Sequence, residues 1–305
     1  MREDSAIKGR IIKGIGGFYY VDVAGAGIYE CRARGIFRKD GKKPLVGDRV
    51  EIEILDESTK TGSVSDLLER DNSLIRPEAA NIDQALVVFA CAHPDPNLTL
   101  LDRFLITIAS EDIPVILCFN KTDLVTKEET EYLTSIYRDA GVTLVAISAK
   151  EEKGFKKLSD LLCGKTTMLA GPSGVGKSTI LNRFCPEAMA DTGEISKKLG
   201  RGRHTTRHSE LFKIEGMEEG SYLMDTPGFT ALSLFDLDEM YVKAYYPEFF
   251  DYEGKCRFME CSHTHEPDCA VKAAVKKDAS DKGISKVRYE NYRLIYEEQK
   301  NRKRF

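Results

Sequence analysis

One eight-residue stretch limits the possible folds of this chain more than any other feature. Residues 171–178 read Gly-Pro-Ser-Gly-Val-Gly-Lys-Ser and match the pattern G-x-x-x-x-G-K-[ST]. An apolar run, Thr167–Ala170, precedes the stretch, and an amphipathic pattern, Lys177–Phe184, follows it. A strand, a glycine-rich turn and a helix in this order predict a loop whose backbone N–H groups surround phosphate oxygens. A chance glycine-rich turn is the alternative, which this context disfavours.

The residues of this loop have separate predicted roles. Lys177 supplies a cation for the β and γ phosphate oxygens, so it is also a catalytic candidate, and the Ser178 hydroxyl ligates Mg²⁺. The predicted nucleotide-binding set in this stretch is Gly171, Pro172, Ser173, Gly174, Val175, Gly176, Lys177, Ser178 and Thr179.

A second motif predicts which base the nucleotide carries. Asn120-Lys-Thr-Asp123 follows the apolar run Pro114–Phe119. A carboxylate at Asp123 can accept hydrogen bonds from both N1–H and the 2-amino group of guanine, whereas adenine offers neither donor. Asn120 is expected to tie the loop together, and the stem of Lys121 to cover one face of the base.

Two further loops have matching roles, and each follows a predicted strand. The segment 148–150, Ser148-Ala149-Lys, offers a backbone N–H to the guanine O6. In Asp225-Thr-Pro-Gly228, the Asp225 carboxylate reaches Mg²⁺ through water and the Gly228 N–H meets the γ-phosphate. A hydroxyl of the basic segment 201–207, Thr206, is expected to cover Mg²⁺ and the γ-phosphate; a plain polar loop at Thr205 and Thr206 is the alternative.

Apolar runs alternate with amphipathic helices from Ile82 onward, which indicates a mostly parallel α/β sheet. The predicted strands are Ala85–Ala90, Pro114–Phe119, Val142–Ile147, Thr167–Ala170 and Tyr222–Met224, and the predicted helices are Thr99–Ser110, Lys127–Ala140, Gly154–Leu162 and Lys177–Phe184. The base-reading motifs precede the phosphate loop, whereas in ordinary GTPases the phosphate loop comes first. A sheet tolerates this circular permutation if the original termini were close together.

The first 69 residues have a pattern of short strands and turns without the helices expected after Ile82. Five short runs of alternating or β-branched residues, separated by glycine-rich turns, predict a small barrel of the oligonucleotide-binding (OB) type. The runs are Ile7–Ile12, Gly17–Val23, Ile28–Arg34, Arg49–Leu55 and Ser63–Leu68.

Charge is distributed unevenly over the chain. The total is 45 basic and 49 acidic residues, yet residues 1–50, 196–213 and 271–305 carry net charges of +5, +5 and +6. Three basic islands in an acidic chain could meet one polyanion such as RNA, although each alone could be an ordinary solvated surface. No apolar run is long enough for a membrane span and no export signal is visible, so we expect a soluble intracellular protein.

A cysteine and histidine cluster lies near the C-terminus. Cys256, Cys261, His263 and Cys269 offer three thiolates and an imidazole within 14 residues, a donor set that suits tetrahedral Zn²⁺. Four protein ligands leave no open position, so one structural zinc ion per chain is expected. His265 is a competing ligand, and unligated thiols are the alternative. A basic helix around Lys286–Arg304 follows, with interleaved tyrosines that favour either RNA contact or core packing.

Together these motifs closely resemble the ribosome small subunit-dependent GTPase A family, over essentially the whole chain. The shared motifs are N-K-T-D, S-A-K, G-P-S-G-V-G-K-S, R-G-R-H-T-T and D-T-P-G-F, in that order. The resemblance implies a bacterial cytoplasmic GTPase that acts late in maturation of the 30S subunit. It also implies stimulation of GTP hydrolysis by that subunit, contact of the barrel with 16S ribosomal RNA, and zinc on His263.

The residue after Gly228 bears on catalysis. Ras-like proteins place a glutamine there to orient the attacking water, but this chain has Phe229, which cannot hydrogen-bond water. Slow intrinsic hydrolysis is therefore expected. His204 is the best internal candidate for the missing group, and the resemblance supports it; His208 is next. An RNA-contacting histidine is the alternative role of His204.

We therefore expect three domains: an RNA-binding barrel (1–69), a circularly permuted P-loop GTPase domain (70–233) and a helical zinc-binding domain (234–305). The chain is expected to be a monomer that uses Mg²⁺ with GTP or GDP and has no membrane partner. Two other functions fit part of the pattern. One is an RNA-binding scaffold with a regulatory nucleotide; the other, which Asp123 disfavours, is an ATP-using small-molecule kinase.

Overall fold

The computed structural model describes residues 6–35, 37, 43–75, 77–186, 209–226, 237–276 and 283–302. The chain forms two compact units, each assembled from separated segments. The first contains Met1–Gln84, Ser159–Ala170 and Ser178–Phe229; the second contains Ala85–Leu158, Gly171–Lys177 and Thr230–Phe305.

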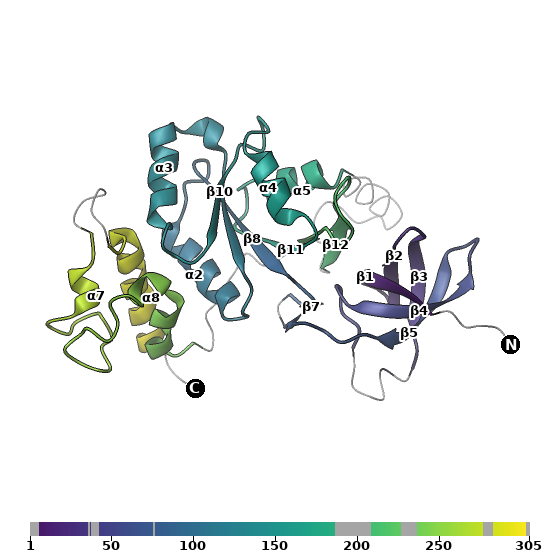
Figure 1. Cartoon of the computed structure of the whole chain (residues 1–305), viewed down its shortest axis with the longest axis horizontal. Coiled ribbons are helices and arrows are strands. Elements are labelled where there is room, and N and C mark those ends of the chain that lie inside the picture. The colour runs from purple at the N-terminus through teal and green to yellow at the C-terminus, as the bar shows by residue number, and fades with distance from the viewer. Residues whose placement is uncertain are drawn as a thin grey trace. The chain divides into compact units, whose positions relative to one another are not determined.

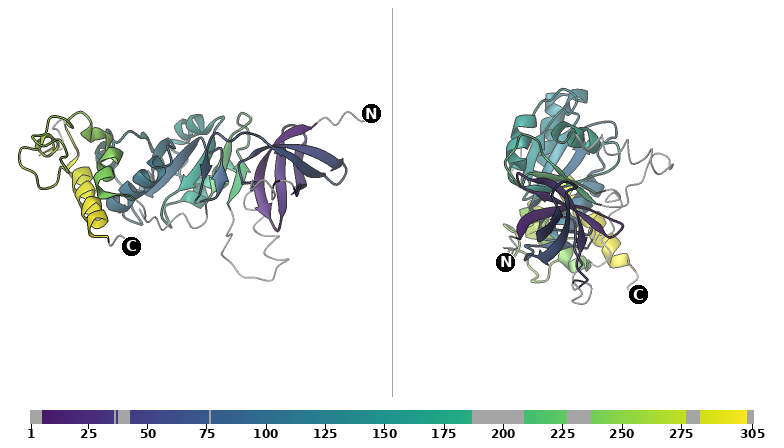
Figure 2. Two further views of the ribbon diagram at one scale, coloured as in Figure 1. Left: turned by 90° about the horizontal axis from the view of Figure 1, so that it is seen from below. Right: turned by 90° about the vertical axis from the view of Figure 1, so that its right-hand side faces the viewer.

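Five strands of the first unit close into a barrel (Figure 1). They are β1 (Ile7–Ile15), β2 (Phe18–Val23), β3 (Gly27–Ala33), β4 (Arg49–Asp56) and β5 (Thr61–Leu67). The order around the barrel is β1-β2-β3-β5-β4, and β1 pairs antiparallel with both β2 and β4. Figure 2 shows the same purple-to-blue strands from two further directions. Closure removes free strand edges, and Ile11, Val21 and Val50 fill the interior without solvent exposure. The predicted five-stranded barrel is confirmed.

The central sheet has six strands in the hydrogen-bonded order β10-β9-β8-β11-β13-β12. Neighbouring strands pair in parallel within β8–β9, β9–β10 and β11–β13, as the sequence pattern predicts. The strands are β8 (Gln84–Ala90), β9 (Val115–Asn120), β10 (Thr143–Ala146), β11 (Thr166–Ala170), β12 (Glu210–Lys213) and β13 (Tyr222–Asp225). Every residue of β8 and β11 is buried, because strands inside a parallel sheet are covered on both faces. A separate ribbon joins β6 (Ser73–Leu74) to β7 (Ala79–Ala80).

Local signals explain where the helices begin. The Asn97 side chain caps α2 (Leu98–Ala109) by accepting from the backbone N–H of Leu100. Thr126 and Glu129 form a capping box at the start of α3 (Lys127–Ile136). The other helices of this region are η1 (Thr122–Leu124, a 3₁₀ turn), α4 (Phe155–Leu162) and α5 (Lys177–Phe184).

Two elements differ from the sequence prediction. The helix expected over 127–140 ends at Ile136, and Tyr137–Ala140 continue as turns closed by 3₁₀-type hydrogen bonds. The edge strand β12 was not expected; it pairs antiparallel with β13, and only Leu211 of its four residues is buried. Four residues with one buried side chain are too few for an alternating pattern to be recognised.

Polar contacts join the barrel to β12 and β13 within the first unit. The Tyr222 hydroxyl donates to the Asp22 carboxylate at 2.6 Å, and Lys213 Nζ lies 3.2 Å from the same oxygen. Burial and this carboxylate raise the pKa of Tyr222. Lys13 of β1 pairs with Glu210 of β12 at 2.7 Å. Ion pairs thus join β1 and β2 of the barrel to β12, and the Tyr222 hydroxyl joins β2 to β13, the strand that ends at Asp225.

The C-terminal region contains the 3₁₀ helices η2 (Glu239–Tyr245) and η3 (Pro247–Phe249), the single turn α7 (Ala270–Ala273) and the longer helix α8 (Lys286–Asn301). Its core includes Tyr246, Phe249 and Tyr292, all fully buried, together with Ile106 from α2. The tyrosines of α8 therefore pack on a core rather than form an exposed stripe. The helix expected to reach Arg304 ends at Asn301, and residues 303–305 lie outside the described residues.

One basic residue of α8 is buried as deeply as the core. Arg288 is 1% exposed; its guanidinium donates to Asp102 of α2 at 2.6 Å and to Glu248 of η3 at 2.7 Å. The guanidinium also lies over the ring of Tyr246, 4.3 Å from its centroid. Although the sequence places Arg288 in a basic helix, its charge neutralises two buried carboxylates and is not available on the surface.

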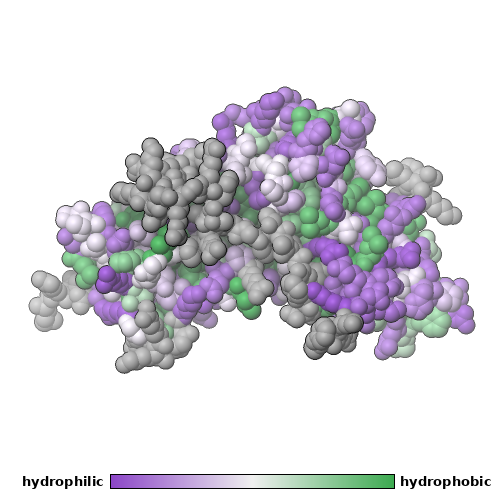
Figure 3. All heavy atoms as spheres, turned by 180° about the vertical axis from the view of Figure 1, so that it is seen from behind, coloured by the Kyte–Doolittle hydropathy of each residue, from purple (hydrophilic) through white to green (hydrophobic). Residues whose placement is uncertain are grey.

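The described helices include none that is long and apolar enough to span a bilayer. On the face drawn in Figure 3, hydrophilic side chains of the described residues interrupt the smaller hydrophobic areas.

We predict that Arg288→Ala lowers the free energy of unfolding by about 3–5 kcal/mol, because it leaves Asp102 and Glu248 buried without their countercharge. Arg293→Ala, on an exposed position of the same helix, should change it by less than about 0.5 kcal/mol. Urea denaturation followed by circular dichroism and tyrosine fluorescence measures both, since the chain has 13 tyrosines and no tryptophan. Equal urea midpoints for the two variants would contradict the prediction.

Candidate functional site

The glycine-rich loop lies between β11 and α5, as predicted. Lys177 is the first residue of α5, and its Nζ donates to the carbonyls of Gly171 and Pro172, each at 2.7 Å. The loop is thus wrapped around the ammonium group. Ser173 and Gly174 are exposed at the tip, Val175 is buried beneath it, and the hydroxyl-bearing Ser178 and Thr179 are exposed in the first turn of α5.

Two glycines of the loop are required by close approaches. Gly171 has φ +134°, and a Cβ added there would lie 2.2 Å from the carbonyl oxygen of Val88. Gly176 has φ +100°, and its Cβ would lie 2.2 Å from Nδ2 of Asn120. Real Cβ atoms do not tolerate such distances, so these positions need glycine for space as well as for backbone conformation.

The Asn120 carboxamide connects three loops. It is 1% exposed at the end of β9, and its Nδ2 donates to the Val175 carbonyl of the glycine-rich loop at 2.9 Å. Its Oδ1 accepts from the backbone N–H of Lys121 at 2.7 Å and from that of Ala149 at 3.0 Å. One side chain therefore joins the 120–123, 148–150 and 171–178 segments, which the sequence predicts to converge.

The neighbouring residues of the motif lie around the same junction. Lys121 adopts the left-handed conformation (φ 64°), and its Nζ donates to the carbonyls of Gly174, at 2.7 Å, and of His93. The Ser148 hydroxyl is fully buried; it donates to Asp123 Oδ1 at 2.6 Å and lowers the pKa of Asp123. This bond favours the ionised form of Asp123 and fixes one of its oxygens, as recognition of a base requires.

Asp225 ends β13 and pairs in register with Leu169 of β11, two residues before the glycine-rich loop begins. The hydroxyl of Thr226 donates to the Leu169 carbonyl at 2.8 Å and holds the two strand ends together. The remaining candidates, His204, Thr205, Thr206, His208, Gly228 and Phe229, lie outside the described residues.

A second cluster brings Cys256, Cys261, His263 and Cys269 together, with all ligand atoms within 4.8 Å of one another. Cys256 Sγ lies 3.8 Å from Cys269 Sγ and 3.6 Å from His263 Nδ1, and Nδ1 lies 3.4 Å from Cys269 Sγ. A tetrahedral ion with bonds of about 2.3 Å to sulfur and about 2.0 Å to nitrogen separates sulfurs by roughly 3.8 Å and sulfur from nitrogen by roughly 3.5 Å. The group therefore fits a metal ion.

The structure also distinguishes the two histidines. His265 is exposed and its Nδ1 lies 3.0 Å from the Thr264 hydroxyl, whereas His263 is 2% exposed with its Nδ1 among the sulfurs. Burial lowers the pKa of His263, which favours the neutral ring that a metal ligand requires. Its other nitrogen, Nε2, lies 3.2 Å from the Glu253 carboxylate.

Glu253 was not singled out from the sequence. A carboxylate on the outer nitrogen of a ligating histidine fixes the tautomer and orientation of the ring. Glu253 lies 10 residues before His263 in an acidic stretch, so only the general expectation of such a partner could have pointed to it.

Comparisons with known proteins agree with this geometry. The family description "RsgA GTPase" matches residues 67–235, and "RsgA N-terminal domain" matches residues 8–63. An Agathobacter rectalis protein named small ribosomal subunit biogenesis GTPase RsgA is 49% identical over 307 aligned residues, which cover 97% of this chain and 99% of that protein.

The chain belongs to the RsgA GTPase family. As a member it is a GTP hydrolase, and the permuted order of its motifs is a family property. The crystal structure of YloQ, described as a circularly permuted GTPase, has a TM-score of 0.75 and 35% identity and covers 100% of this chain and 99% of that one. The crystal structure of YjeQ from Thermotoga maritima has a TM-score of 0.76 and 31% identity, with coverages of 97% and 99%.

We predict that Asn120→Asp weakens GDP binding by about tenfold or more, the change that about 1.4 kcal/mol produces. A carboxylate keeps the bonds from Lys121 and Ala149 but directs an oxygen, not an N–H group, at the Val175 carbonyl. Titration with a fluorescent GDP analogue measures the affinity.

The matched control is Asn97→Asp. Aspartate caps a helix as well as asparagine, so α2 should be kept and GDP affinity unchanged. If Asn120→Asp bound GDP as tightly as this control, the junction would not depend on the Asn120 amide group.

Proposed function

We propose that this GTPase acts on the small ribosomal subunit: it binds the 30S particle through 16S ribosomal RNA, acts late in its maturation, and hydrolyses GTP to GDP and phosphate faster on the particle. The observation that carries the proposal is the Asn120 junction, which joins the loop predicted to read guanine to the loop predicted to hold phosphates. The ribosomal part rests on the names of relatives that span nearly the whole chain.

The roles proposed around the base follow from hydrogen bonding. Asp123, ionised and oriented by Ser148, accepts from N1–H and the 2-amino group of guanine. The Lys121 stem covers the base. Because the Ala149 N–H already donates to Asn120, we assign the contact with the guanine O6 to the Lys150 N–H.

The glycine-rich loop and the residues predicted to bind Mg²⁺ have the proposed roles at the phosphates. The backbone N–H groups of residues 171–176 surround the phosphates and Lys177 moves from its loop carbonyls to the β and γ oxygens. The Ser178 hydroxyl, Asp225 and Thr206 would hold Mg²⁺, which when bound would supply positive charge that neutralises the phosphates. The Gly228 N–H meets the γ-phosphate.

Hydrolysis needs a group that orients the attacking water, because Phe229 cannot do so. We assign this role to His204. Slow turnover by the chain alone, and faster turnover on the particle, follow if the particle places His204 beside the γ-phosphate.

The experiment for the proposed function is GTP turnover measured alone and with purified 30S subunits, 50S subunits or free RNA. Stimulation by 30S alone is expected, and equal stimulation by free RNA would refute particle specificity. His204→Ala should keep GTP affinity and lower 30S-stimulated turnover by roughly a hundredfold, the size of a general acid–base contribution. His265→Ala, an exposed histidine elsewhere, should leave turnover unchanged.

We further propose that the cysteine and histidine cluster holds one structural Zn²⁺, since three thiolates and an imidazole match the softness and geometry that zinc prefers. No ligand position is left for catalysis. The proposed domains are 1–69, 70–233 and 234–305, in a cytoplasmic monomer.

Elemental analysis after dialysis should find one zinc ion per wild-type chain and per His265→Ala chain. Cys269→Ser should hold well below half of that amount, because it removes a buried ligand at the centre of the cluster. Loss of zinc from the His265→Ala chain would instead make His265 a ligand.

A further inference from the structure

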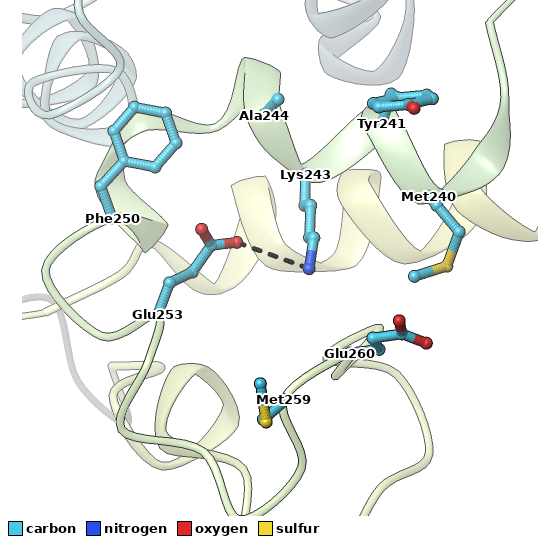
Figure 4. A pocket seen from close by; sticks show the side chains of 8 residues that line it. All are labelled: Met240, Tyr241, Lys243, Ala244, Phe250, Glu253, Met259 and Glu260. Atoms are coloured by element: carbon cyan, nitrogen blue, oxygen red, sulfur yellow. Dashed lines mark ion pairs between the residues drawn. The ribbon is translucent and has the colours of Figure 1, made fainter.

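The C-terminal region has a hollow, and of its lining residues only Glu253 has a role described above. Its volume is about 440 Å³. One side is formed by η2, another by the chain that follows η3, and the third by the loop between two cysteines of the metal cluster (Figure 4). The lining residues are Met240, Tyr241, Lys243, Ala244, Phe250, Glu253, Met259 and Glu260.

The rim of the hollow exposes large apolar side chains. Tyr241 is 65% exposed, Phe250 is 53% exposed and Met259 is fully exposed. Aromatic and methionine side chains are costly to leave in water, and they are the residues that protein interfaces use as anchors. The flexible thioethers of Met240, on η2, and Met259, on the loop between the cysteines, both line the hollow and can adapt to an inserted side chain (Figure 4).

The charge around the hollow is negative. Its lining has two carboxylates and one ammonium, and Lys243 is already paired with Glu253 at 4.0 Å (Figure 4). Residues 237–268 hold eight acidic and three basic residues. Glu248 is buried against Arg288, so the others carry a net charge of 3 − 7 = −4. Phosphate groups of RNA are repelled from such a surface, whereas lysine and arginine side chains are attracted to it.

From these observations we propose that the hollow binds a basic protein segment carrying an apolar side chain. The apolar residue enters between Met240 and Met259, and flanking lysine or arginine residues contact Glu260. In the context of the proposed function, on which this inference rests, the segment belongs to a protein of the 30S particle. RNA contact is then left to the basic islands.

The floor of the hollow is connected to the metal cluster. Glu253 contacts His263 Nε2, and Lys243 Nζ donates to the Cys261 carbonyl at 3.1 Å. A segment that fills the hollow therefore covers the groups that orient two metal ligands. Its binding should slow removal of the metal by a chelator.

The test places a photoreactive residue in the hollow of the full-length, metal-loaded chain, as Met259→p-benzoylphenylalanine. Purified 30S subunits are added, sedimented and irradiated. We expect an adduct that resists ribonuclease and maps by mass spectrometry to a lysine- or arginine-rich protein segment. The control, Leu294→p-benzoylphenylalanine, is 60% exposed on α8 and should not label that segment.

Charge dependence is tested in the same photoreactive chain. Glu260→Lys should lower the yield of the protein adduct at least fivefold, and Glu297→Lys, at an exposed position of α8, should not. Metal content is measured for both, so that damage to the cluster is recognised. Chelator-driven metal release should be slower with 30S bound than without.

Each outcome decides between the possibilities. A chain that sediments with 30S but labels RNA, labels the same segment from position 294, or labels nothing overturns the inference while the proposed function stands. A wild-type chain that does not sediment with 30S overturns both.

Discussion

The nucleotide site depends on one carboxamide. Asn120 lies 55 residues before Val175 and 29 residues before Ala149, yet its single buried amide binds both backbones. This bond pattern brings the segment that carries Asp123 against the glycine-rich loop and forces the close approach that only Gly176 permits. Nδ2 satisfies a carbonyl that would otherwise be buried without a donor, and Oδ1 satisfies two N–H groups. The loop proposed to read the base and the loop proposed to hold the phosphates therefore form one hydrogen-bonded unit, although they are separated in the sequence.

Local patterns predicted the barrel, the parallel strands and the converging loops, because each rests on a few neighbouring residues. The phosphate loop needs only its own glycines and the flanking strand and helix, and strand β8 is recognisable as a continuous apolar run. Features that depend on distant partners were not predictable. In the sequence, Arg288 is one of several cations of a basic helix. Its burial depends on its pairing with Asp102, which lies 186 residues away in the chain. Similarly, Lys121 Nζ donates to the carbonyls of His93 and Gly174, and no sequence motif indicates these two contacts. Spacing alone also left His265 as an alternative to His263.

The metal cluster and helix α8 stabilise each other. The hydroxyl of Tyr289 donates to the His263 carbonyl at 2.8 Å, and that of Tyr292 donates to the Ser262 carbonyl. These aromatic rings are at the same time part of the core around Phe249. A loop of this length cannot bury enough apolar surface to order itself. Tyrosine donors from outside contribute to its order, and the proposed metal ion would add ligation from within. The spacing of tyrosines along α8, which could have served nucleic-acid stacking, is explained by this packing.

The buried guanidinium of α8 also limits how this protein can be dissected. A chain shortened to end before Lys286 would lose Arg288 and Asn291, the two α8 side chains that bind the Asp102 carboxylate on α2. It would also expose the apolar face of α2 around Ile106, which packs in one core with Tyr292 and Ile295 of α8. Such a deletion would therefore injure the remaining protein, and a defect in nucleotide turnover seen in it would report misfolding around α2.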